Sequence, residues 1–110
     1  MIALSLSDIA EAVDGTLVLG GVDTGATVLT GAVETDSRRI QAGGIFVAKP
    51  GETTDGHLFV PAAVRGGARL AIVERELDAA ALGGDISQLV VADAVAALGA
   101  ELAGHRRSGP

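Results

Sequence analysis

Three short apolar runs constrain the fold of this chain more than any other feature of its sequence. They read GIFVA at residues 44–48, RLAIVE at residues 69–74 and SQLVVA at residues 87–92. Runs this short, bounded by glycine or charged residues, are typical of buried strands, whereas a buried helix needs about ten residues or more. We therefore predict that they form strands of one sheet.

The segments beside these runs change to helical spacing. Val60, Ala63 and Val64 can share one helix face, and Pro61 is tolerated in a first turn. Leu6, Ile9, Ala10 and Val13 also recur at helical spacing, which predicts a second helix whose start is capped by Ser7 and whose end lies at Gly15.

The rest of the chain completes the pattern. A last helix is predicted to begin after an Asp93 cap and to run to about Arg107. Residues 16–19 and 28–33 are further strand candidates, and residues 75–85 are mostly connection. We expect a small single domain of the α/β class, with a three-layer α/β/α arrangement and a mixed sheet.

Composition narrows the classes of function. The chain has 110 residues, no cysteine and a formal charge of −6, and its only aromatic residues are Phe46 and Phe59. The absence of cysteine excludes disulfides and thiolate metal sites. Because the basic residues are scattered, nucleic acid and anionic membranes are not expected as partners.

The beginning of the chain, MIALSLSDIAEAVDG, lacks a basic segment followed by a long apolar core, so we do not expect a signal peptide. No apolar run reaches the ~20 residues that span a bilayer. A cytoplasmic location is therefore expected.

No catalytic or metal-binding residues are predicted. Ser37, His57 and a nearby aspartate can be nominated as a triad, but no G-x-S-x-G elbow surrounds the serine. The two histidines lack metal-ligand spacing. There is no G-x-G-x-x-G and no G-x-x-x-x-G-K-[ST], so we expect that this chain alone does not hydrolyse ATP.

Two polar clusters flank the buried run at residues 44–48. Asp36, Ser37 and Arg38 precede it, and KPGETTDGH follows it. Residues beyond the carboxyl ends of neighbouring strands line the crevice where α/β sheets hold ligands. Arg38 offers charge for a phosphate and Ser37 a hydroxyl, although Asp-Ser and Asp-Gly are also common turn sequences.

The stretch TDSRRIQAGGIFVAKPGETTDGHLF, from Thr35 to Phe59, resembles the N-terminal signature of the Mur ligases. The family pattern is T-D-S-R, a short spacer, G-x-[IL]-F-V-A, then P-G and D-G-H-x-F. AAVRGGARLAIVER and LVVADAVAALGAELAGHRR resemble the helix and strands that follow in the family. The resemblance covers nearly the whole chain, from Met1 to about Arg107, and is far more specific than a lone G-x-G-x-x-G.

The resemblance implies a set of residues that shape the pocket for the uridine diphosphate (UDP) moiety of the substrate: Thr35, Asp36, Ser37, Arg38, Gly51, Asp55, Gly56 and His57. Asp36 can instead brace its own loop. Two residues depart from the family: Leu58 stands where Asp is usual, and Lys49 stands where an apolar residue is usual. The first removes a natural helix cap.

The resemblance also implies a role within a longer enzyme. Mur ligases use ATP and Mg²⁺ to activate a peptide carboxylate, and the ATP site lies in a central domain. Residues 1–107 are then an N-terminal domain for UDP-N-acetylmuramoyl peptide, and residues 108–110 begin the linker to the central domain. No cofactor is expected in this fragment.

The two ends of the chain look most like the member that adds D-alanyl-D-alanine during peptidoglycan precursor synthesis. The alternatives are the member that adds diaminopimelate or lysine, and a stand-alone nucleotide-sugar binding module.

Overall fold

Five strands form the main sheet of the molecule. The computed structural model describes residues 4–21, 24–29, 32–49 and 55–97 of the chain. The strands lie in the order β2-β7-β6-β5-β4, and their bounds are Thr16–Val18 (β2), Val33–Glu34 (β4), Ile45–Val47 (β5), Leu70–Val73 (β6) and Ser87–Val90 (β7). Strands β4 to β7 are parallel, and β2 is antiparallel to β7. The mixed sheet predicted from the three apolar runs is confirmed.

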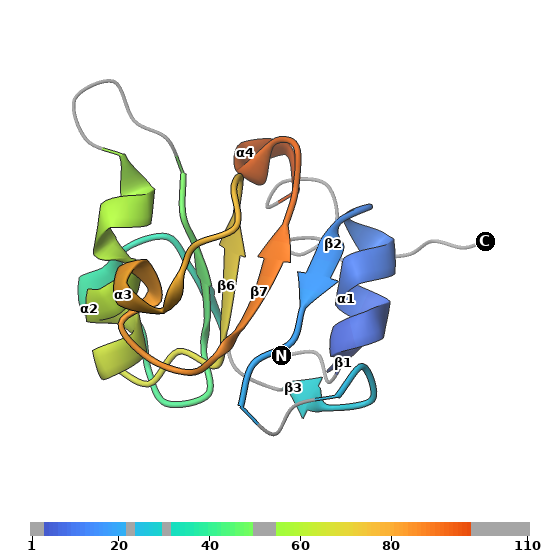
Figure 1. The fold of residues 1–110 in the computed structure, drawn as a ribbon, viewed down its shortest axis with the longest axis horizontal. Coiled ribbons are helices and arrows are strands. Elements are labelled where there is room, and N and C mark those ends of the chain that lie inside the picture. Colours follow the sequence, from blue (N-terminus) through green and yellow to red (C-terminus); the bar gives the residue numbers. More distant parts are fainter. Residues whose placement is uncertain (1–3, 22–23, 30–31, 50–54, 98–110) are drawn as a thin grey trace.

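Helices cover both faces of this sheet. Helix α1 (Leu6–Ala12) lies on one side, and α2 (Val60–Arg65) and α3 (Ala79–Leu82) lie on the other (Figure 1). The described part of α4 (Ala94–Ala97) begins just beyond the end of β7. The predicted three-layer arrangement is therefore confirmed.

Alternation along the strands divides the core into two apolar clusters. The cluster beside α1 contains Leu6 and Ile9 of that helix, together with Ile45, Val47, Leu70 and Ile72 of the sheet. The cluster beside α2 and α3 contains Val60, Ala63 and Leu82, together with Phe46, Ala48, Ala71 and Val73. A strand buried on both faces needs apolar residues at every position, which explains the continuous runs in the sequence.

The two described ends of the strand predicted over residues 28–33 belong to different sheets. Val28–Leu29 (β3) pairs antiparallel with Leu4–Ser5 (β1) in a separate two-stranded sheet, whereas Val33–Glu34 belongs to the main sheet as β4. The prediction of one strand was wrong because the two halves find hydrogen-bond partners in different parts of the chain.

The boundaries of α1 also differ from the prediction. Ser5, not Ser7, caps the helix: its Oγ accepts a hydrogen bond of 3.1 Å from the N–H of Asp8. Pairing of β1 with β3 ends at Ser5, so the helix begins at the next residue. It ends at Ala12, before Gly15, and Asp14 takes the left-handed conformation with φ 55°.

The sequence did not predict helix α3, but it did predict the cap of helix α4. The segment predicted as connection contains α3, which is capped by Asp78: its Oδ1 accepts from the N–H of Ala81 at 2.9 Å. The predicted cap of the last helix is confirmed, because Asp93 Oδ1 accepts from the N–H of Ala96 at 3.1 Å. The predicted continuation of this helix to about Arg107 lies outside the described residues.

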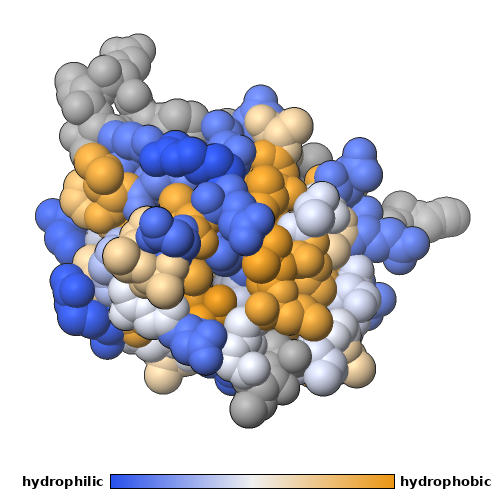
Figure 2. All heavy atoms as spheres, viewed as in Figure 1, coloured by the Kyte–Doolittle hydropathy of each residue, from blue (hydrophilic) through white to orange (hydrophobic). Residues whose placement is uncertain are grey.

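Apolar side chains gather over β2 and β7 on the face shown in Figure 2, beside the part of the sheet that α2 and α3 cover. Val18 of β2 and Val90 of β7 are half-buried, and Leu19, which follows β2, is 49% exposed. Within the described ranges, no helix combines the length and apolar character that crossing a bilayer requires.

Candidate functional site

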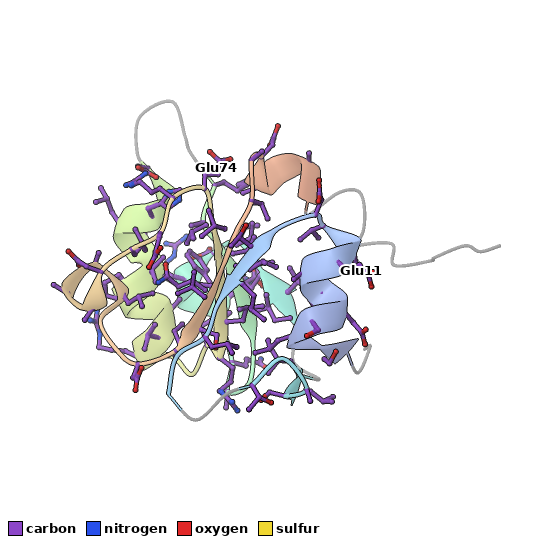
Figure 3. The ribbon with its side chains drawn as sticks, turned by 45° about the vertical axis from the view of Figure 1, so that its right-hand side comes forward. Glu11 and Glu74 are labelled. Atoms are coloured by element: carbon purple, nitrogen blue, oxygen red, sulfur yellow. The ribbon has the colours of Figure 1, made fainter. Side chains whose placement is uncertain are left out.

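The carboxyl ends of parallel strands meet at one edge of the main sheet, and the predicted site residues lie along it. Residues 35–38 follow β4, residues 55–57 lie in the connection after β5, and Glu74 follows β6. Figure 3 shows Glu74 at this edge beside α4, far from Glu11 on α1. Ligand sites of α/β proteins lie outside the carboxyl ends of the strands.

Asp36 organises the first loop. It caps the 3₁₀ helix η1 (Ser37–Arg39), and its Oδ1 accepts from the N–H of Arg38 at 2.9 Å. Its two carboxylate oxygens also accept from Nε and Nη2 of Arg38, both at 3.0 Å. The side chain and then the backbone N–H of Arg38 lower the pKa of Asp36 to about 2.

The two bonds from the Arg38 guanidinium to the Asp36 carboxylate position the Arg38 side chain. This side chain is 87% exposed, so the guanidinium is presented to solvent while Asp36 fixes its orientation. Asp36 braces the loop, which is one of the two roles that the sequence left open.

Glu34, which the sequence did not single out, supports the same loop. Its Oε2 accepts from the N–H groups of Thr35 and Asp36 at 3.2 and 3.3 Å. These two donors point back at the end of β4, so they are not offered to a ligand. The only signal in the sequence was the position of Glu34 directly before the signature.

The first loop forms one wall of a pocket of about 500 Å³ lined by Thr35, Asp36, Ser37, Arg38, Phe59 and Ala62. The size falls in the range of small-ligand sites, roughly 300–1,000 Å³. Phe59 and Ala62 come from the end of the 3₁₀ helix η2 (Gly56–Phe59) and from α2. Sequence reasoning did not assign them, although Phe59 is the last residue of the signature.

The second cluster is organised around the buried ring of His57. Asp55 Oδ1 lies 2.6 Å from Nδ1 of His57 and accepts from the His57 backbone N–H at 3.0 Å. Nε2 accepts from the N–H of Glu74 at 2.9 Å. Because Nε2 is an acceptor, the proton of the neutral ring lies on Nδ1 and is donated to Asp55.

Asp55 is held by a second partner as well. Its Oδ2 receives Nη2 of Arg75 at 3.1 Å. The backbone N–H and the ring of His57 are the main causes that lower the pKa of Asp55 to about 2, and Arg75 adds to them. Both ring nitrogens of His57 are thus engaged within the protein, where they join the connection after β5 to the residue that follows β6.

Gly56 is required by a close approach of the backbone. Its N–H donates to the carbonyl of Lys49 at 2.8 Å, and an added Cβ would lie 2.4 Å from that oxygen. Any side chain at this position collides with the backbone that leaves β5. Gly51, the remaining predicted site residue, lies outside the described residues.

Lys49 and Leu58, the two departures from the family pattern, both leave the local turns intact. Lys49 is exposed, and its backbone still makes the turn with Gly56. Leu58 is 69% exposed, and no side chain caps α2. Asp55 instead caps η2 by accepting from the His57 backbone N–H, so the turn before α2 is fixed without a carboxylate at position 58.

The structure brings the first cluster together with Phe59 and Ala62, not with Asp55, Gly56 and His57. Among the described residues, no hydrogen bond joins Ser37 to His57, and no group of three or more metal-ligating side chains is present. The arrangement is a pocket of ligand size beside a hydrogen-bonded structural cluster.

The fold and this site define a class: a small α/β domain with a ligand-sized pocket at the carboxyl edge of its parallel strands. The sequence model of one protein family, described as "Mur ligase family, catalytic domain", matches residues 30–109. The chain belongs to the Mur ligase family, as its resemblance implied.

Individual relatives support this membership. UDP-N-acetylmuramoyl-tripeptide–D-alanyl-D-alanine ligase of Escherichia coli (strain K12) is 36% identical over 110 residues, which are 100% of this chain and 22% of that protein. UDP-N-acetylmuramoyl-L-alanyl-D-glutamate–2,6-diaminopimelate ligase of Bacteroides fragilis is 35% identical over 96 residues, which are 87% of this chain and 19% of that protein.

A crystal structure of MurF from Acinetobacter baumannii superposes with a TM-score of 0.71 at 35% identity, covering 90% of this chain and 20% of that one. The chain therefore spans about a fifth of the length of the relatives it matches.

Proposed function

We propose that this chain is the N-terminal, UDP-binding domain of an ATP-dependent ligase that adds D-alanyl-D-alanine to UDP-N-acetylmuramoyl-tripeptide in peptidoglycan precursor synthesis. One observation carries the proposal: all four residues of the T-D-S-R signature line a single ligand-sized pocket. The names of the relatives, in which ligases for D-alanyl-D-alanine are prominent, supply the reaction.

Within this proposal, the chain binds substrate and does not perform the chemistry. Its residues do not fit ATP and Mg²⁺, because the sequence has no G-x-x-x-x-G-K-[ST] and its described residues hold no cluster of metal-ligating side chains. We assign ATP, Mg²⁺ and D-alanyl-D-alanine to other parts of the enzyme. Residues 1–107 then form the domain, residues 108–110 begin a linker, and the compartment is the cytoplasm.

The contacts of the described residues divide the proposed site residues into a group that lines the pocket and a group that is bonded within the protein. Thr35, Ser37 and Arg38 present side chains at the pocket. Asp55, Gly56 and His57 bond within the protein, to one another, to Lys49 and to Glu74. We propose that the first group contacts UDP and that the second has a structural role beside the pocket.

The alternative is the same domain of the ligase that adds diaminopimelate or lysine. Both enzymes take a UDP-muramoyl substrate, so the UDP pocket does not distinguish them. A stand-alone nucleotide-sugar binding module is the second alternative. The downstream coding sequence decides this point: a G-x-x-G-K-T motif shortly after Pro110 supports a ligase, and a natural stop codon at that point contradicts it.

The direct test is a titration of UDP against the isotopically labelled 110-residue chain, followed residue by residue through backbone chemical shifts. We expect weak, saturable shifts in residues 35–38, Phe59 and Ala62, with residues 6–12 of α1 as the internal control. Weak binding is expected because other domains would supply further contacts, and each ~1.4 kcal/mol that they supply corresponds to tenfold in affinity. Shifts confined to residues 93–107 would place the site elsewhere.

A further inference from the structure

Phe59 is an aromatic residue whose side chain lies outside the apolar core. The chain has two phenylalanines and no Tyr or Trp. Phe46 is 1% exposed in the core, whereas Phe59 is 44% exposed and lines the pocket beside the first loop. An exposed phenyl ring on a pocket wall offers a flat apolar surface to whatever enters.

The helix that follows Phe59 is anchored in the core. Val60 and Ala63 are fully buried in the core and anchor α2 against the sheet. Phe59 and Ala62 are three residues apart, so they are neighbours on the other side of the same turn, and both line the pocket.

The charges around the pocket nearly cancel. Asp36 and Arg38 are the only ionisable residues among the lining residues, and they pair with each other at 3.0 Å. The remaining lining residues are two hydroxyl-bearing and two apolar side chains. A lining of this kind fits an uncharged planar ring with polar edges better than a diphosphate, because a diphosphate needs unpaired positive charge.

We propose that Phe59 is a specificity-determining residue that selects a flat heterocyclic base by stacking on it, while the hydroxyls of Thr35 and Ser37 meet the polar edge of the base. The inference rests on the proposed function, in which the base is the uracil of UDP. Stacking of a base on an aromatic side chain changes affinity by about tenfold or more.

The test compares three probes, UDP, uridine and inorganic pyrophosphate, by isothermal titration and chemical shifts on the 110-residue chain. For Phe59→Ala we expect UDP and uridine to bind about tenfold more weakly than to the unaltered chain. Phe59→Tyr should keep the affinity, and the response to pyrophosphate should be the same in all variants. Leu58→Ala is the matched control, because Leu58 is the adjacent residue, is 69% exposed and does not line the pocket.

The outcomes separate this inference from the proposed function. If the unaltered chain binds UDP and Phe59→Ala binds it equally well, the role of Phe59 is wrong and the proposed function stands. Equal weakening of UDP and pyrophosphate binding by Phe59→Ala also overturns the stacking role. If the unaltered chain shows no UDP binding, the proposed function fails and the inference fails with it. Should Phe59→Ala not fold, as judged by its amide spectrum, Phe59→Leu gives the same comparison with the side-chain volume nearly retained.

Discussion

Nε2 of His57 accepts a hydrogen bond of 2.9 Å from the backbone N–H of Glu74. This bond ties the connection after β5 to the end of β6. The carboxylate of Glu74 in turn accepts from the N–H of Ala94 at 2.8 Å, at the start of α4. One buried imidazole and one glutamate therefore join three segments at the edge of the sheet where the pocket lies.

The buried ring of His57 makes a direct stability prediction. His57→Phe retains a ring but loses both nitrogens, so it leaves the Glu74 N–H without its acceptor. An unsatisfied buried N–H costs about 1–3 kcal/mol in the free energy of unfolding, and for this part-buried N–H we expect about 1 kcal/mol. Urea denaturation measures the change, and Leu58→Ala, at an exposed neighbouring position, should stay within about 0.5 kcal/mol of the unaltered chain. Equal stabilities of the two variants would refute a structural role for the ring.

Low pH should weaken the hydrogen bonds between Asp55 and His57. The pKa of Asp55 is lowered from 3.8 to about 2 in the folded chain. Since the folded value lies below the unfolded one, the carboxylate contributes stability above pH 3.8 and loses it as pH falls toward 2. We expect the melting temperature to drop between pH 4 and pH 2. The variant Asp55→Asn should be less stable at neutral pH and should approach the unaltered chain near pH 2. Parallel curves across this range would contradict the assignment.

Gly56 should tolerate no side chain. In Gly56→Ala the new Cβ would lie 2.4 Å from the carbonyl oxygen and 2.7 Å from the nitrogen of Lys49, both backbone atoms that cannot swing aside. We expect a loss of about 3 kcal/mol in unfolding free energy. Gly43→Ala is the matched control: it has φ +85° and no atom within 4 Å of the new Cβ, so it reports backbone strain alone. Its expected cost is about 1 kcal/mol. Chemical denaturation of both variants checks the order, and a smaller effect at Gly56 would contradict the clash.

Ser37 and Arg38 should affect UDP binding to different degrees. Ser37→Ala removes a single neutral hydrogen bond, worth about 0.5–1.5 kcal/mol. Arg38→Ala should cost more, because it leaves the carboxylate of Asp36 without the partner that neutralises it, next to an anionic ligand. Adding Asp36→Asn to Arg38→Ala removes the carboxylate charge that Arg38 had neutralised, and it should recover part of the affinity. Titration calorimetry on the three variants measures these differences. If Arg38→Ala lowers only the melting temperature and leaves UDP affinity intact, Arg38 braces the loop and does not meet the ligand.

Local patterns in the sequence determined most of the secondary structure. The apolar runs at residues 44–48, 69–74 and 87–92 became β5, β6 and β7, because strands buried on both faces need uninterrupted apolar residues. The change of the apolar residues to helical spacing after residue 59 predicted α2, and Asp93 predicted the start of α4. The signature of residues 35–38 also marked the wall of the pocket before its geometry was known.

Contacts between segments that are distant in the sequence decided the features that local patterns predicted wrongly or did not predict. Val28–Leu29 pairs with β1 and Val33–Glu34 with β5, so the two ends of one predicted strand lie in different sheets. The start of α1 moved to Leu6 for the same reason. The residue pattern alone does not say that Phe59 stands across from the signature loop, or that the ring of His57 points at Glu74. Those placements depend on how α2 packs against the sheet and on the parallel order of β5 and β6, which only the folded chain fixes.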